Sequence, residues 1–139
     1  MKCSYLKLLL PFILMTALSC DGYKARLTEI SWVAVEVRII RSDQTARLSD
    51  NEIRFLENGK CQLPEILRFD RRDLINQPDA TWEYFKDSEH SYVLIKSRNI
   101  FNGKYIYYLD NDPSTAWKMT LISDSLKIIC APFCLSQIK

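Results

Sequence analysis

The sequence predicts an all-β protein, an antiparallel up-and-down barrel of about eight strands that follows a cleaved signal peptide. In residues 101–130, apolar and polar side chains alternate with a period of two, which is typical of strands with one buried face. The dipeptides Asn58-Gly59 and Asn102-Gly103 indicate hairpin turns, and no stretch of the mature chain favours a long helix. Eight sequential strands in roughly 105 residues suit an up-and-down barrel.

The first segment, residues 1–19, has the composition of a signal peptide. Lys2 and Lys7 supply its positive charge, and an apolar run of eleven residues follows from Leu8 to Leu18. A membrane-spanning helix needs about 20 apolar residues, so this run is too short to span a bilayer. We therefore expect the segment to direct secretion and to be removed.

The end of that segment, Ala17-Leu18-Ser19-Cys20, resembles the lipobox of bacterial lipoproteins. The resemblance implies that the Cys20 thiol carries acyl chains such as palmitate and that Cys20 becomes the new N-terminus. The protein would then be lipid-anchored to a bacterial membrane of the cell envelope, at its periplasmic or surface face. The alternative is an ordinary secretory signal cleaved before Cys20, which would release a secreted protein.

The charge of the mature chain excludes several partners. The full chain has 19 Lys and Arg and 17 Asp and Glu, and the two lysines of the signal peptide are lost on cleavage. The resulting neutral protein argues against a nucleic-acid partner and against electrostatic attachment to anionic lipid. With three glycines in all, the chain has no glycine-rich phosphate-binding loop, which argues against nucleotide enzymes.

The first half of the mature chain predicts a tether and three strands. Cys20 and the polar residues up to Leu27 form the tether, and residues 28–131 form the domain. In residues 29–40 an amphipathic strand is expected, with Val33, Val35, Val37 and Ile39 on one face. A loop (41–50), a second strand (52–56), a type I′ turn at Asn58-Gly59 and a third strand (61–63) follow, and Pro64 interrupts the third.

The second half predicts five more strands. Residues 65–79 are consistent either with a continued, bulged strand or with a short helix that starts at Pro64. Strands are expected at 80–86 and 91–96, and then in a closing meander at 104–109, 117–121 and 126–130. Turns at Asp110–Pro113 and Ser123-Asp124 join the meander, and residues 132–139 form a tail.

Two runs carry a resemblance to lipocalin-like domains. FNGKYI (101–106) and WKMTLISDSLKI (117–128) look like the closing strands of such domains, and Trp32 matches the tryptophan of the first strand. The sequence departs from the family pattern at Ile30, where a glycine is usual. Trp32 is also out of phase with Val33, Val35 and Val37. The resemblance implies a barrel that either encloses one small ligand or is nearly filled by side chains.

Four cysteines remain after signal removal, and Cys20 is expected to be acylated. Three thiols then allow at most one disulfide in a monomer. By analogy with the tail disulfides of many lipocalins, we expect Cys61–Cys134, with Cys130–Cys134 as the alternative. The spacing of Cys130 and Cys134 is not that of a redox pair, and no histidine is near, so no metal site is predicted. His90, the single histidine, is expected in a solvated turn.

The sequence predicts no catalytic residues and no cofactor, and two functions remain open. The first is a binding module that holds a small hydrophobic ligand. The residues expected to line its cavity are Trp82, Tyr84, Tyr105, Tyr107, Trp117 and Met119. The alternative is a non-catalytic structural or interaction protein whose filled barrel contacts another envelope protein through an outer face that includes Ile106 and Tyr108.

Overall fold

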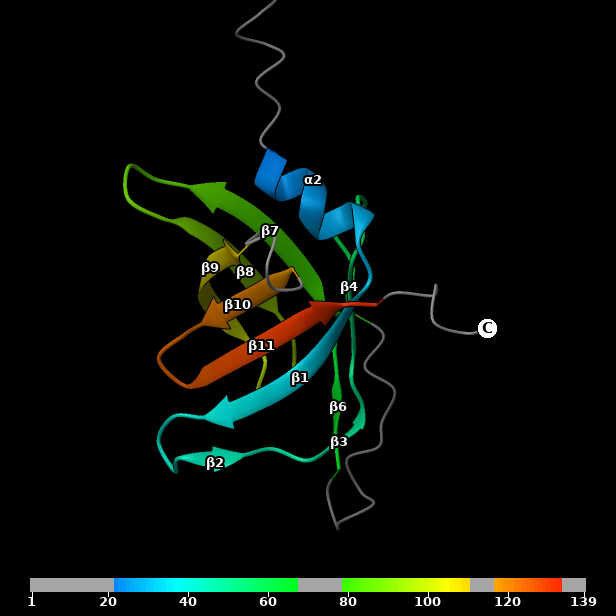
Figure 1. The fold of residues 1–139 in the computed structure, drawn as a ribbon, viewed down its shortest axis with the longest axis vertical. Helices are drawn as coiled ribbons and strands as arrows, with labels where there is room; N and C mark the ends of the chain where they lie inside the picture. The colour runs from blue at the N-terminus through cyan, green and yellow to red at the C-terminus, as the bar shows by residue number, and fades with distance from the viewer. Residues whose placement is uncertain (1–21, 68–78, 111–116, 134–139) are drawn as a thin grey trace, which may run out of the picture.

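The computed structural model describes residues 22–67, 79–110 and 117–133 (Figure 1). Its fold is all-β, as the sequence predicts. In these residues one helix, α2 (Gly22–Glu29), precedes the strands. They are β1 (Trp32–Ile39), β2 (Gln44–Thr45), β3 (Leu48–Asp50), β4 (Glu52–Phe55), β5 (Cys61–Gln62), β6 (Glu65–Ile66), β7 (Thr81–Lys86), β8 (Ser91–Lys96), β9 (Gly103–Asp110), β10 (Lys118–Ile122) and β11 (Leu126–Pro132).

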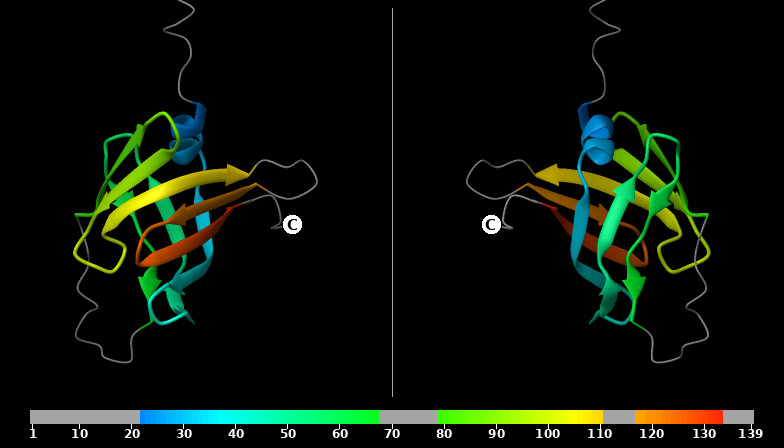
Figure 2. Two further views of the ribbon diagram at one scale, coloured as in Figure 1. Left: turned by 90° about the vertical axis from the view of Figure 1, so that its left-hand side faces the viewer. Right: turned by 90° about the vertical axis from the view of Figure 1, so that its right-hand side faces the viewer.

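The main sheet is antiparallel and nearly closed into a barrel (Figure 2). Its strands follow the order β5-β4-β1-β11-β10-β9-β8-β7, and β2 adds to the edge of β1. The two ends of this order meet where Lys60 bridges to Thr81. Two backbone hydrogen bonds close the ring there, from Cys61 N to Ala80 O (3.0 Å) and from Trp82 N to Gly59 O (2.9 Å). The predicted up-and-down barrel of about eight strands is confirmed.

A β-bulge at Val35 divides β1 into two halves of opposite phase. Ala34 pairs with Cys130 of β11, but Glu36 pairs with the preceding Ile129, so Val35 is an extra residue. Trp32 and Ala34 are therefore buried before the bulge and Val37 after it, while Val35 is 62% exposed. The predicted burial of Val33 and Val35 on the face of Val37 is wrong. The bulge also explains why Trp32 is out of phase with the valines.

Both predicted Asn-Gly hairpins connect strands, but neither has the predicted geometry. At Asn58-Gly59 only the glycine has a positive φ, of 81°, so the type I′ turn is wrong. Gly59 N donates to Leu56 O (3.0 Å) and Leu56 N to Lys60 O (2.9 Å), which makes a three-residue loop with glycine in the left-handed region. Between β8 and β9, a longer loop of residues 97–102 replaces a two-residue turn.

The predicted polar tether is a helix instead. α2 occupies residues 22–29 and buries Leu27 completely in the barrel core. Its Arg26 guanidinium lies 4.7 Å above the centre of the Trp117 ring, which adds a cation–π contact between the helix and the segment before β10. Within the described ranges, no helix combines the length and the apolar character needed to cross a membrane.

The remaining differences concern the second sheet. The predicted loop at 41–50 contains all of β2 and β3, and β3 pairs with β6 in a separate two-stranded sheet. Of the two alternatives for residues 65–79, the strand is confirmed at Glu65–Ile66, and residues 68–78 lie outside the described part of the chain. Pro64 does interrupt the strand, because β5 ends at Gln62 and the chain then changes sheet. The turn expected at Asp110–Pro113 also lies largely outside the described residues.

Candidate functional site

The barrel interior holds five of the six residues that the sequence assigns to a ligand cavity. Trp82, Tyr105, Tyr107 and Met119 are buried in one hydrophobic cluster, and Tyr84 packs against its edge. Trp117 lies outside this cluster, half-buried against Arg26 of α2. The cluster also contains large side chains that the sequence did not assign to any site: Leu27, Trp32, Ile53, Phe55, Phe101, Leu121, Leu126 and Ile128.

Aromatic rings of the interior pack against one another, and two of them form hydrogen bonds to backbone carbonyl groups. Phe55 and Trp82 have ring centres 5.0 Å apart, and Tyr84 and Tyr107 meet edge to face at 6.3 Å. Trp82 Nε1 donates to Leu56 O (2.8 Å), and the Tyr105 hydroxyl donates to Phe101 O (2.8 Å). Burial raises the pKa of Tyr105 and keeps its hydroxyl neutral. These contacts are those of a packed core.

The indole nitrogen of Trp32 differs from these atoms. Trp32 is fully buried, and among the described residues its Nε1 has no hydrogen-bond partner. A buried donor without a partner costs about 1–3 kcal/mol. The sequence identified Trp32 only through its resemblance to a first-strand tryptophan, so this feature could not be foreseen.

The cysteines of the described residues are unreactive thiols. Burial raises the pKa of both Cys61 and Cys130 to about 12, so both are protonated at neutral pH and are poor nucleophiles and metal ligands. Both are free, so the structure gives no support to the predicted Cys61–Cys134 disulfide, and Cys134 lies outside the described residues. In the described part of the chain, no three His, Cys, Asp or Glu side chains gather as they would around a metal ion.

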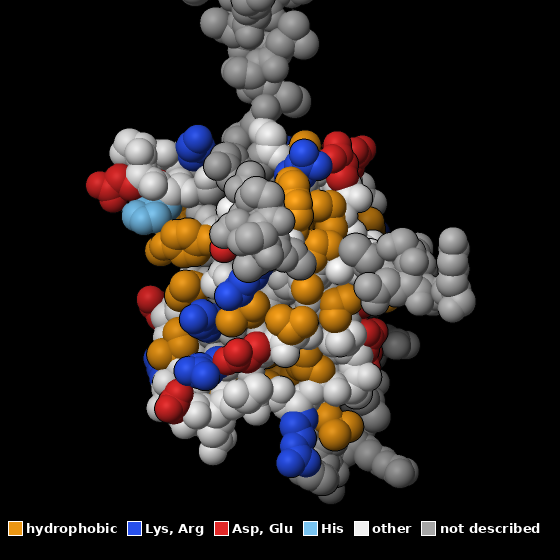
Figure 3. Space-filling model, in the orientation of Figure 1, with side chains coloured by type: hydrophobic (Ala, Val, Ile, Leu, Met, Phe, Trp, Pro, Cys, Tyr) orange, Lys and Arg blue, Asp and Glu red, His pale blue; other side chains and the backbone are white. Residues whose placement is uncertain are grey.

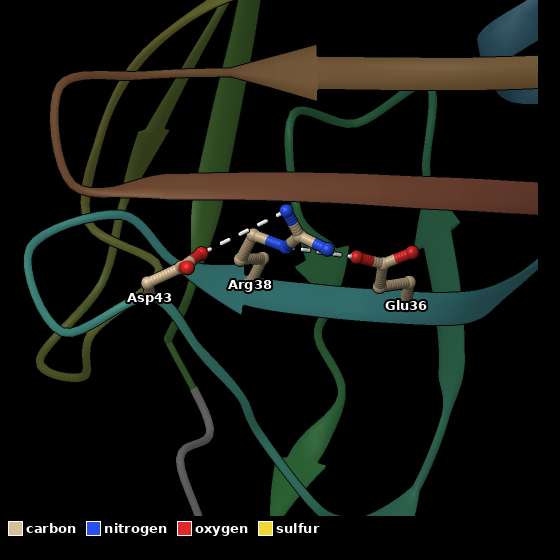
Figure 4. A network of polar contacts seen from close by, with 3 residues as sticks. All are labelled: Glu36, Arg38 and Asp43. Atoms are coloured by element: carbon tan, nitrogen blue, oxygen red, sulfur yellow. Dashed lines mark hydrogen bonds and ion pairs between the residues drawn. The ribbon is translucent and has the colours of Figure 1, made fainter.

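A hollow of about 340 Å³ opens on the barrel side beside the bulge. Residues of β1, with Ala46, Leu48, Ser49 and Asn51, line it. Its single charged lining residue is Glu36, whose Oε1 accepts a hydrogen bond from Arg38 Nε at 3.1 Å (Figure 4). Arg38 Nη1 also lies 3.7 Å from Asp43 Oδ1. Glu36 is thus already paired, and the described residues that line the hollow offer no unpaired charge to a ligand.

The β7–β8 turn contains His90, as predicted. Asp87 Oδ1 accepts hydrogen bonds from the backbone N–H groups of Glu89 (2.9 Å) and His90 (2.7 Å). These two bonds lower the pKa of Asp87. His90 Nδ1 lies 3.9 Å from the exposed Glu89 carboxylate, and its ring centre lies 6.0 Å from that of Tyr92. The arrangement is that of a structural turn.

An aromatic surface lies on the outer wall of β7, β8 and β9. Register places Phe85 opposite Tyr92 and Tyr92 opposite Ile106, and Tyr108 follows on the same face of β9. We call these four residues the outer patch. Phe85 and Tyr92 stack with ring centres 5.1 Å apart, and Lys104 Nζ lies 4.1 Å above the Tyr92 ring. Hydrophobic side chains reach the surface between charged ones in Figure 3.

The outer patch confirms the predicted outward orientation of Ile106 and Tyr108. Tyr108 is 47% exposed and Ile106 is partly exposed, while Tyr105 and Tyr107, which alternate with them, are buried in the core. Phe85 and Tyr92 were missed as members of the same surface. Alternation within residues 81–86 would have placed Phe85 outward, but only the strand register shows that it meets Tyr92.

Comparisons of this chain with protein families, with curated proteins and with solved structures found no match.

Proposed function

We propose that this chain is a non-catalytic lipoprotein of a bacterial envelope, anchored by acyl chains on Cys20. In this proposal a lipocalin-like barrel with a filled interior uses its outer patch to contact another envelope protein. The observation that carries the proposal is the packing of the interior, because rings expected to line a ligand cavity pack against other rings instead, Trp82 against Phe55 and Tyr84 against Tyr107. It favours the interaction protein over the carrier of a hydrophobic ligand.

The outer patch, on the outer face of the barrel, also supports an interaction with another protein. Phe85 and Tyr108 expose large rings to solvent, and stacking holds Phe85 and Tyr92 in place. Exposed aromatic side chains that are already rigid lose little conformational entropy on binding, and aromatic residues are enriched in protein interfaces. The flanking Lys104 adds one charge with which a partner could be selected.

Native mass spectrometry of the mature protein, purified from its own cells, separates the two functions. We expect the mass of the acylated chain alone. A discrete extra mass that disappears on denaturation would support the ligand carrier and contradict a filled barrel, and its value would begin to identify the ligand.

A photo-crosslinking amino acid at Tyr108 tests the partner in living cells. We expect one defined adduct with another envelope protein, and Ile106→Asp should abolish it because a charge would enter the interface. The matched control is the same probe at Val35, which is more accessible than Tyr108 (62% against 47% exposed) but lies on β1. Equal crosslinking from both positions would contradict a specific outer patch.

The anchor has its own test and control. Cys20→Ala should move the protein from the membrane fraction to the soluble fraction, because the acylated thiol is lost. Cys3→Ala, which changes a cysteine inside the signal peptide, should leave the protein in the membrane. Continued membrane association of Cys20→Ala would contradict the lipid anchor.

A further inference from the structure

The helix α2 fixes the start of the domain to the barrel. Leu27 is completely buried in the hydrophobic core, and α2 lies against β4. Arg26 holds the same helix against the Trp117 ring. Since a buried leucine contributes about 2–5 kcal/mol relative to alanine, residues 22–29 are part of the folded domain and cannot act as a loose linker.

The chain between Cys20 and this helix is very short. Only Asp21 separates Cys20 from Gly22, the first residue of α2. Two residue steps span at most about 7 Å, even when fully extended. Acyl chains on Cys20 would therefore hold the α2 end of the barrel directly against the lipid headgroups.

Two large apolar side chains are exposed at this end. Leu56 directly follows β4, against which α2 lies, and its side chain is 44% exposed. Phe133 is 50% exposed, and its N–H donates to the carbonyl of Ser31, two residues beyond α2 (2.7 Å). We call Leu56 and Phe133 the α2 rim. Removal of such surface from water contributes about 25 cal/mol per Å².

We propose that the barrel stands on the lipid surface with the α2 rim in contact with the membrane, so that the outer patch on the wall faces sideways toward a protein partner. This inference rests on the acylation of Cys20 in the proposed function. The segments next to the rim carry charges of both signs, Lys24 and Glu29 on α2 and Glu57 and Lys60 after Leu56. The contact is therefore apolar, and neither salt nor anionic lipid should change it.

The far end of β1 supplies a matched control position. Ile40 directly follows β1 and is 43% exposed, nearly the same as Leu56. β1 starts beside α2 and runs away from it (Figure 1). A strand of eight residues is about 26 Å long, so Ile40 should stay well above the headgroups if the rim rests on them.

The test uses full-length acylated protein, reconstituted in phosphatidylcholine vesicles with brominated acyl chains. Leu56→Trp and Ile40→Trp each add one indole, and the parent protein gives the background from the three native tryptophans. Bromine should quench the added indole of Leu56→Trp and leave that of Ile40→Trp unchanged, because interfacial apolar side chains reach about 5–10 Å into the headgroup boundary. Phe133→Trp provides a second probe of the rim if Leu56→Trp misfolds.

Each outcome decides between the proposals. Equal quenching at both positions, or none, in protein that floats with the vesicles would overturn the orientation and leave the anchor intact. Protein that does not float with the vesicles would overturn the anchor and the orientation together. A rim covered by a second copy of the chain would give unquenched Leu56→Trp fluorescence that varies with protein density, which would also overturn contact with lipid.

Discussion

Trp82 joins the two ends of the barrel sheet through Leu56. Its indole Nε1 donates to the Leu56 carbonyl at 2.8 Å, and its backbone N–H donates to Gly59 O at 2.9 Å. Both bonds join β7, at one end of the strand order, to the loop between β4 and β5 at the other end. The Phe55 ring, 5.0 Å away, covers the indole. One side chain therefore both fills the core and holds the ring of strands closed.

Trp82→Phe should lower the free energy of unfolding by about 1–3 kcal/mol, because it removes the indole hydrogen bond to the Leu56 carbonyl and leaves part of the indole volume in the core empty. Urea unfolding followed by far-ultraviolet circular dichroism measures the change. Trp117→Phe is the matched control, since it changes a half-buried tryptophan outside the core cluster and should cost less. A larger loss for Trp117→Phe would contradict the role given to Trp82.

Deletion of Val35 should be far more damaging than Val35→Ala. The deletion removes the bulge, so either Trp32 and Ala34 or Val37 and Ile39 must turn toward solvent. The expected cost is similar to the truncation of a buried tryptophan, about 3–5 kcal/mol. Val35→Ala changes an exposed side chain and should stay within about 0.5 kcal/mol of the parent in urea unfolding. Equal stability of the two variants would show that β1 tolerates either register.

The loss of stability at acidic pH should depend on Asp87. Its folded-state pKa lies below the ordinary value of 3.8 because two backbone N–H groups bond to its carboxylate. The stabilisation is therefore fully present above pH 3.8 and is lost as the pH falls through the lower folded-state pKa. Asp87→Asn should flatten this part of a plot of melting temperature against pH. Asp124→Asn, in the turn before β11, controls for the change in net charge, and an equal effect of both variants would argue against Asp87.

Leu27→Ala should release α2 from the barrel and destabilise the domain by about 2–5 kcal/mol, since the side chain is fully buried. Limited proteolysis with mass mapping should show new cleavage within residues 22–30. Lys24→Ala changes an exposed residue of the same helix and should leave the digestion pattern unchanged. Resistance of Leu27→Ala to cleavage would mean that other contacts hold the helix.

The sequence predicts much of this fold because, in a strand with one polar face, the alternation of apolar and polar side chains shows which residues are buried. In residues 103–110 it placed Tyr105 and Tyr107 inward and Tyr108 outward, as observed. The same rule failed in β1, because Val35 is chemically like Val33 and Val37 and nothing local marks it as the extra residue. α2 was missed because Leu27, the fully buried apolar residue among its described side chains, packs against residues that are distant in the sequence.

For the candidate site too, the sequence predicts what depends on one strand but not what depends on contacts between distant residues. Alternation along the strands correctly predicted that five of the six expected residues lie in the interior. Trp117 precedes β10 and contacts α2 instead. Asn58-Gly59 is compatible with two hairpin geometries, and the residues alone do not select one. Whether aromatic side chains line a cavity or fill a core depends on all the strands at once, so alternation along any single strand could not decide it.

The pairing of the first barrel strand with the last one has a consequence for how the chain folds. Trp32 of β1 pairs with Pro132 of β11. These two residues are neighbours in space, but nearly the whole sequence of the domain separates them. Contacts of such high sequence separation slow folding, because a long loop must close before they form. β1 can pair early with β2 and β4, but over two residue pairs each, and its long pairing partner is missing until β11 has left the ribosome. An N-terminal fragment therefore cannot build the barrel. For the proposed lipoprotein, a barrel that cannot close until synthesis is complete would suit export through a translocation channel as an extended polypeptide.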